Sequence, residues 1–290
     1  MNRPTAAALH HPGHSRGLFD IPRWWFLLKL LVRKELRVRY RGSVLGMLWT
    51  YVKPATQLVV YYIAMGRFLK LNAAIDNYVV YLFSGIVVVN LFNEVLRNTT
   101  SSIVGNAPLV GKIYLPRELF PVASLWVAFV HFIPQVVVLL IGAIIFGWRP
   151  GLLNLLAVVG GILIVSILAL GLGLMFAAWN VLFRDAENFV ELIGMVSIWL
   201  SPVFYKWSMV ASAVPDWLWT VYQMNPLSMA VELFHYAFWV PTGAVDHSGV
   251  GLMPANMPGW IIATTVFSVV LLVFGQMVFR HHEARFAEEL

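Results

Sequence analysis

Residues 22–57 read PRWWFLLKLLVRKELRVRYRGSVLGMLWTYVKPATQ, a basic amphipathic segment that runs directly into an apolar one. Lys29, Arg33, Arg37 and Arg41 recur every four residues, which places them on one face of a helix. Trp and aliphatic side chains form a neighbouring stripe, and such a helix is suited to lie along a membrane surface. Positive charge just before a first span also fixes the side of the membrane on which that segment lies.

The composition of the 290-residue chain is that of a membrane protein. Sixty per cent of its residues are hydrophobic and only 12% are charged, whereas soluble domains carry about 25% charged residues. Asp, Glu, Lys and Arg are absent from residues 119–148, 150–183 and 247–279. Each of these gaps exceeds the roughly 20 apolar residues that cross a bilayer. The net charge of +6 therefore belongs to membrane topology and gives no reason to expect nucleic-acid binding.

The apolar segments predict an all-α fold with six transmembrane helices. Their approximate ranges are residues 47–69, 78–96, 122–146, 152–179, 189–204 and 260–279. Two apolar pieces between the fifth and sixth spans, at about 217–223 and 227–240, are too short to cross the bilayer. We expect them to form re-entrant or interfacial outer helices within about residues 207–240. Small residues in the fourth span predict close helix contacts at Gly160, Gly161, Gly171 and Gly173.

The remaining segments divide the chain into four parts. Residues 1–20 contain His, Pro and Gly without an apolar core, so we expect a disordered cytoplasmic tail. Residues 21–42 form the predicted interface helix, with Asp20 available to cap it. Residues 43–280 form the membrane domain, including a short cytoplasmic coupling helix within about residues 106–118, and residues 281–290 form a second cytoplasmic tail.

Cations are distributed unequally between the two sides that six spans define. Sixteen of the 20 Lys and Arg residues fall on the side of both termini, and four fall opposite. Because cytoplasmic loops carry the excess of positive charge, both termini are predicted to be cytoplasmic. The interface helix itself fits either a plain membrane anchor or a docking surface for a soluble partner, since both require the same charge pattern.

No catalytic, cofactor or metal site is predicted. In GNAPLVGKI, residues 105–113, five residues separate the glycines where a phosphate-binding loop needs four, and Ile113 stands where a hydroxyl must bind magnesium. The absence of Cys rules out disulfides and thiolate chemistry. Glu94 and Glu191 lie near the inner membrane boundary and are functional candidates by position. Each is also placed to pair with a cation such as Arg97 or Arg184.

Aromatic side chains are frequent within and near the spans, and they stack well on the apolar faces of sugar rings. A carbohydrate path lined by them is one interpretation, and packing against lipid is the other. The candidate path residues are Trp49, Tyr61, Tyr62, Trp126, Trp199 and Tyr205.

Four ordered motifs closely resemble the membrane subunits of polysaccharide and teichoic-acid ABC exporters of the type-2 class. They are RKELRVRYRGSVLGMLWTYVKPATQLVVY at 33–61, NAPLVGKIYLPRELFPVAS at 106–124, LFRDAENFVEL with SPVFY at 182–192 and 201–205, and MNPLSMAVELFH at 224–235. The resemblance covers about residues 22–285. It implies a homodimer that binds two copies of a separate ABC ATPase, which would hold ATP and Mg.

The resemblance also implies which residues meet that ATPase. They are Arg33, Lys34, Glu35, Arg37, Arg39, Tyr40, Arg41, Asn106, Pro108, Leu109, Lys112, Tyr114, Pro116, Arg117, Glu118, Arg184 and Asp185. The expected function is export of a lipid-linked glycan, such as O-antigen, capsule, teichoic acid or a galactan precursor, across the bacterial inner membrane. This chain would be a transport subunit and not an enzyme. The alternative hypotheses are a secondary transporter and a membrane-embedded glycan-processing enzyme.

Overall fold

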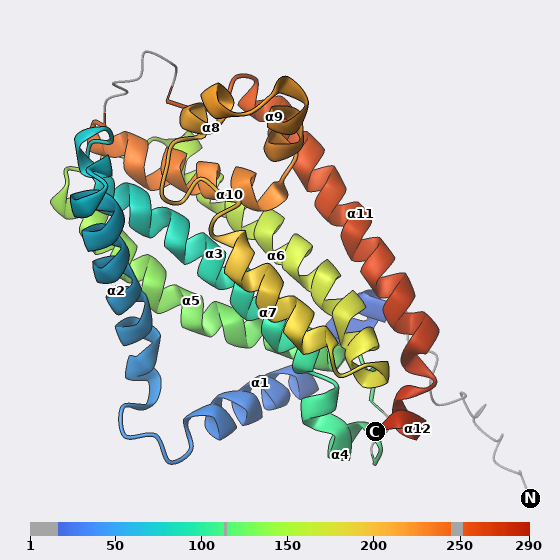
Figure 1. Cartoon of the computed structure of the whole chain (residues 1–290). Coiled ribbons are helices and arrows are strands. Elements are labelled where there is room, and N and C mark those ends of the chain that lie inside the picture. The colour runs from blue at the N-terminus through green and yellow to red at the C-terminus, as the bar shows by residue number, and fades with distance from the viewer. Residues whose placement is uncertain (1–16, 113–114, 245–251) are drawn as a thin grey trace, which may run out of the picture.

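The computed structural model describes residues 17–112, 115–244 and 252–290, and these ranges contain helices and no strand. Four helices are long and apolar enough to cross a membrane. They are α3 (Tyr78–Ser101), α5 (Leu119–Ile145), α6 (Leu152–Leu182) and α11 (Met257–Glu283). They match the second, third, fourth and sixth predicted spans (Figure 1).

Helix α3 forms the centre of the bundle. Its most apolar window is 78% buried, against 17% for α11, and it packs on α5, α6, α7 and α10. The segment YVVYLFSGIVVVNLF, at its start, is apolar on every face, which is the pattern of a helix surrounded by other helices. Figure 1 shows α3 crossing the middle of the molecule, with α11 on the outside.

The first predicted span is interrupted. Residues 46–48 form a 3-10 turn, α2 covers Trp49–Tyr61, and a π-helical stretch continues over Tyr62–Phe68. No single regular helix of spanning length forms here, although residues 49–68 are continuously helical. Within α2 only Pro54 is buried, so this segment lies on the surface of the subunit.

The fifth predicted span ends early. Helix α7 covers Ala186–Ser197, and residues 198–206 turn back without helix. Carbonyl groups freed in this way need donors at membrane depth. Tyr78 and Tyr81 of α3 supply them: the Tyr78 hydroxyl donates to the carbonyl of Phe204 at 3.1 Å, and the Tyr81 hydroxyl donates to those of Pro202 and Tyr205 at 3.0 and 2.7 Å. Side chains of α3 therefore stabilise the early end.

The segment before α11 contains the predicted short helices. They are α8 (Trp207–Ala213), α9 (Asp216–Gln223) and α10 (Pro226–Phe234), and α10 continues as a π-helical turn, His235–Trp239. Helix α9 has no buried residue, whereas every residue of α10 is buried. Helix α10 packs on α3, α6 and α11, so it belongs to the core rather than to an outer surface.

The interface helix begins later than predicted. Residues Gly17–Trp24 form 3-10 helix, α1 covers Trp25–Tyr40, and its N-cap is Trp24. Asp20 instead pairs with Arg23 at 3.6 Å. The coupling segment is also shorter than expected, because α4 covers only Ala107–Val110. Figure 1 places α1, α4 and α12 (Phe286–Glu289) at one end of the bundle and α8 and α9 at the other.

Glycines bring α6 against its neighbours. A Cβ added at Gly171 would lie 2.7 Å from the backbone of Leu272 in α11, and one at Gly173 would lie 2.6 Å from Thr99 in α3. At Gly161 the nearest atom is a ring carbon of Phe234, at 2.9 Å. The close contacts predicted at these three positions are confirmed. At Gly160 the space is ordinary, with the nearest atom at 3.7 Å.

Candidate functional site

A polar network joins the end of α1 to the membrane helices α3 and α5. The Arg39 guanidinium donates from Nη1 to Oε1 of Glu94 and from Nη2 to Oδ1 of Asn98, both at 2.9 Å. The adjacent Tyr40 hydroxyl contacts Nε2 of His131 at 2.8 Å. Glu94 also contacts Nδ1 of His131. The partners of Glu94 are therefore Arg39 and His131, not Arg97 as the sequence suggested.

Both ring nitrogens of His131 have partners. Nε2 lies against the Tyr40 hydroxyl, whose pKa is raised by burial. Nδ1 lies against the Glu94 carboxylate and 3.2 Å from Nη1 of Arg39. His131 is 4% exposed, and its backbone carbonyl accepts from Nε2 of Gln135 at 3.2 Å. Displacing the end of α1 would therefore disturb buried groups in α5.

A second link connects α1 to the segment after α3. Lys34 donates to Oδ1 of the Asn106 side chain, and Asn106 donates to Glu35 at 3.1 Å. The same Asn106 amide donates to the carbonyl of Ser102 at 2.9 Å. These hydrogen bonds join two groups of the predicted docking residues, one group in α1 and the other beside α4.

The structure separates the predicted docking residues by exposure. Those that are exposed are Arg33, Arg37, Arg39, Arg41, Pro108, Lys112, Arg184 and Asp185. Lys34, Glu35, Tyr40, Leu109, Pro116 and Arg117 are half-buried, and Asn106 is buried. Glu118 is 0% exposed and accepts from Nε2 of Gln276 in α11 at 3.1 Å. Because it faces the bundle, Glu118 is unsuited to direct docking in this conformation. Tyr114 lies outside the described residues.

A cavity of about 860 Å³ lies beside the polar network. Helices α1, α2, α3 and α5 all contribute to its wall. The lining residues are Arg39, Tyr40, Trp49, Thr50, Lys53, Pro54, Gln57, Asn90, Asn93, Glu94, Arg97, Asn98, His131 and Gln135. Most of these lining residues have polar or charged side chains.

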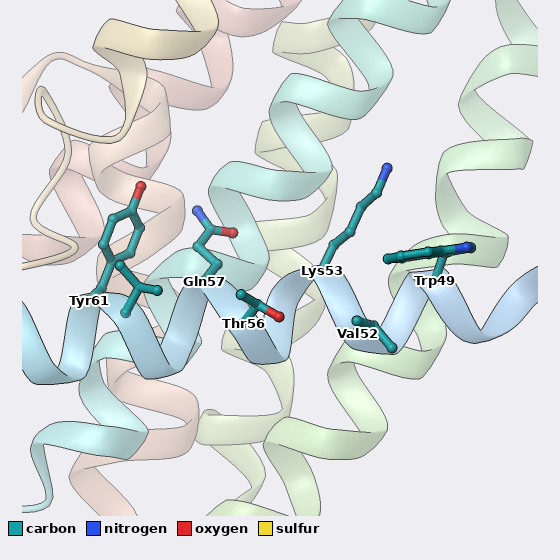
Figure 2. Close-up of a pocket in the computed structure, with 7 residues that line it drawn as sticks. Trp49, Val52, Lys53, Thr56, Gln57 and Tyr61 are labelled. Carbon is teal, nitrogen blue, oxygen red and sulfur yellow. The ribbon is translucent and has the colours of Figure 1, made fainter. Parts of the chain in front are cut away.

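A shallow groove of about 410 Å³ runs along one face of α2. Its lining is Trp49, Val52, Lys53, Thr56, Gln57, Val60 and Tyr61, and these positions recur at three- and four-residue steps. Figure 2 shows Lys53, Gln57 and Tyr61 projecting from the same side of the helix. Trp49, Lys53 and Gln57 also line the polar cavity, so the groove and the cavity adjoin.

The predicted path aromatics fall into separate places. Tyr61 and Trp199 both pack on the ring of Phe204, each with ring centroids 4.9 Å apart, and Tyr205 donates to the carbonyl of Trp199. Tyr62 instead packs against Tyr78 at 6.4 Å. Trp126 lies on α5 and contacts Trp25 of α1 at 5.7 Å. Only part of the set therefore gathers near α2, with Trp49 further along the same groove.

The sequence analysis missed the polar residues that complete the cavity. His131 and Gln135 lie four residues apart in a span free of Asp, Glu, Lys and Arg, so a search for charged residues passes over them. Their four-residue spacing places both on one helix face, and this spacing is the feature of the sequence that could have indicated a polar site. Glu191, in contrast, is exposed on α7, and the part of the chain that the structure describes provides it with no ion pair.

The fold and this site define a multi-pass helical membrane protein whose basic surface helix is bonded to its membrane core. Residues 27–239 match the ABC-2 type transporter family, and the chain belongs to this family. The sequence-based resemblance to type-2 ABC exporter membrane subunits is confirmed at the level of the family.

Curated relatives match almost the whole chain. The O-antigen export system permease protein RfbA of Klebsiella pneumoniae is 26% identical, over 91% of this chain and 95% of its own length. RfbA of Myxococcus xanthus is 27% identical over the same shares. The polysialic acid transport protein KpsM of Escherichia coli is 22% identical, over 88% of this chain and 93% of its own.

Proposed function

We propose that this chain is the membrane subunit of an ATP-driven exporter that moves a lipid-linked polysaccharide out of the cytoplasm. Membership of the ABC-2 family supports the transporter class, and the printed names of the relatives support a glycan cargo. In this proposal ATP is hydrolysed on two copies of a separate subunit, and this chain has no ATPase site of its own. The basic end of the bundle, with α1, is cytoplasmic because positive charge is retained there.

The observation that carries the mechanism is the bonding of α1 to the core. An ATPase that pushes on the exposed Arg33 and Arg37 moves a helix whose end is held to α3 by Arg39 and to α5 by Tyr40. The link from Lys34 to Asn106 adds the segment after α3 to the same moving surface. Docking in two ATP-dependent conformations would then shift the membrane helices between two arrangements.

We further propose that two copies of the chain form the channel along α2. This segment crosses the bundle surface with its polar Lys53 and Thr56 exposed and Gln57 half-buried. Polar groups at membrane depth face protein or water rather than lipid. A second copy placed against this face would enclose the groove, and the aromatic rings of Trp49 and Tyr61 would border the path of the glycan. In this proposal the chain has the six spans predicted from the sequence. The two short ones are α2 with its π-helical continuation, and α7.

Charge reversal at the docking surface tests the proposal. The triple variant Arg33→Glu, Arg37→Glu, Arg41→Glu should insert normally but lose ATPase co-purification and export. The matched control reverses three cations predicted on the other side, Arg67, Lys70 and Arg149, and should keep both. Normal export by the first variant, or equal loss in both variants, would contradict the docking role.

A further inference from the structure

The polar cavity has more positive charge than its own carboxylate can neutralise. Its wall contains three basic side chains, Arg39, Lys53 and Arg97, and one carboxylate, Glu94, which leaves a formal excess of two positive charges. Glu94 already contacts Arg39 and His131. Lys53 and Arg97 are both exposed, and within the described ranges neither forms an ion pair.

The rest of the wall provides donors suited to an anion. Amide side chains from α2, α3 and α5 line it, among them Gln57. The NH₂ groups of Asn90 and Asn93 already donate to Gln135 and to the carbonyl of Gly194, at 3.1 and 3.3 Å, and each has a second N–H. Arg and Lys bind phosphate oxygens through charge-assisted hydrogen bonds, which are stronger than neutral ones. A neutral sugar would require no such excess of charge. The lining is therefore complementary to a phosphate or diphosphate group.

The adjoining groove indicates what is attached to that group. Trp49, Lys53 and Gln57 belong to both spaces, and from them the groove continues along α2 past Val52 and Val60. These two valines are exposed, Val60 by 54%, on a helix that the proposed function places at the depth of the bilayer. While this face of α2 is uncovered, as it is in the single subunit, a ligand with its anion in the cavity can therefore lay an apolar chain along the groove.

We propose that the cavity between α1, α2, α3 and α5 binds the phosphate or diphosphate headgroup of a lipid, with Lys53 and Arg97 as its principal contacts. This inference rests on the proposed function in that the lipid would be the carrier of the exported glycan. Arg39 has a positioning role, because Glu94 and Asn98 already hold its guanidinium.

Binding to the full-length chain, purified in detergent, tests this site without the ATPase. Farnesyl diphosphate is the probe, and farnesol and inorganic pyrophosphate are its two halves. Loss of one phosphate contact should weaken binding about tenfold, which corresponds to about 1.4 kcal/mol. Lys53→Gln and Arg97→Gln should each show this loss, and the double variant about a hundredfold loss. Arg67→Gln removes an exposed charge on the same helical run, outside the cavity, and should bind normally.

Three results would overturn the assignment. Unchanged binding by the double variant, with normal gel-filtration behaviour, would remove the anion site. Equal affinity for farnesol would show that phosphate is not recognised, and equal affinity for inorganic pyrophosphate would show that the lipid is not. Export assays separate this test from that of the proposed function: if the wild-type chain binds the probe but supports no export with its ATPase, the function fails and the site stands.

Discussion

Among the described glycines, Gly275 of α11 has the least room for a side chain. A Cβ added there would lie 2.0 Å from the carbonyl oxygen of Gly171 in α6, and 2.9 Å from its carbonyl carbon. Both obstacles are backbone, so no side-chain rotation relieves the overlap. We therefore expect Gly275→Ala to push the two helices apart.

The size of the effect follows from the geometry. The contact must open from 2.0 Å to the 3.4 Å at which ordinary van der Waals contact begins, a displacement of about 1.4 Å. Overpacking of this kind costs about 1–3 kcal/mol. Alanine is intrinsically the better helix former by roughly 1 kcal/mol, which offsets only part of that cost. The net result should be a loss of stability at the α6–α11 contact.

Thermal unfolding in detergent, followed by fluorescence-detected size exclusion, measures this loss. The matched control is Gly142→Ala in α5, because a Cβ at Gly142 meets no atom within 4 Å. That variant should melt at the wild-type temperature or slightly above it. If Gly275→Ala melts as Gly142→Ala does, the close α6–α11 contact is refuted.

Three further substitutions test other contacts. Tyr81→Phe removes the donor for two carbonyls after α7 and should destabilise the protein by about 1–3 kcal/mol in the same melting assay. The control is Tyr61→Phe, because the Tyr61 ring packs on Phe204 while its hydroxyl forms no hydrogen bond with the residues that the structure describes. Equal melting of the two variants would contradict the donor role. Glu94→Gln should lower export at normal expression and cost roughly 1 kcal/mol of stability, and full export by this variant would count against the α1 linkage. His235→Leu removes the imidazole that lies 3.7 Å from the buried Glu232 and 3.2 Å from the carbonyl of Tyr81, and should cost about 1–3 kcal/mol. The double variant Glu232→Leu with His235→Leu should recover part of that loss, and additive losses would argue against the pair.

Much of the fold follows from local sequence pattern. The charge-free gaps locate α5, α6 and α11, and the proline positions delimit α9 and α10. These features depend on residues close together in the chain. The early end of α7 could not be predicted in the same way, because the donors that permit it are Tyr78 and Tyr81, more than 100 residues earlier.

The candidate site was predictable only in part. The basic face of α1 is a local pattern, and its exposed Arg33 and Arg37 lie where that pattern indicates. The partners of Glu94 come from positions 55 residues before it and 37 residues after it, so only the packing of three helices brings them together. The packing of other helices against α5 decides whether His131 and Gln135 are buried, and counting charged residues in the sequence does not reveal it.

The peripheral position of α11, which packs chiefly on one neighbour, has a consequence for biosynthesis. Its apolar window is 17% buried, and its contacts are chiefly with α6, with a smaller number to α10. Helices α3, α5, α6 and α10 make the larger part of the core without it. Because α11 is the last long helix in the chain, we expect the other helices to pack before it is made, with Gly171 of α6 leaving space for its backbone. A chain divided within residues 245–251 and expressed as two fragments should reassemble in the membrane.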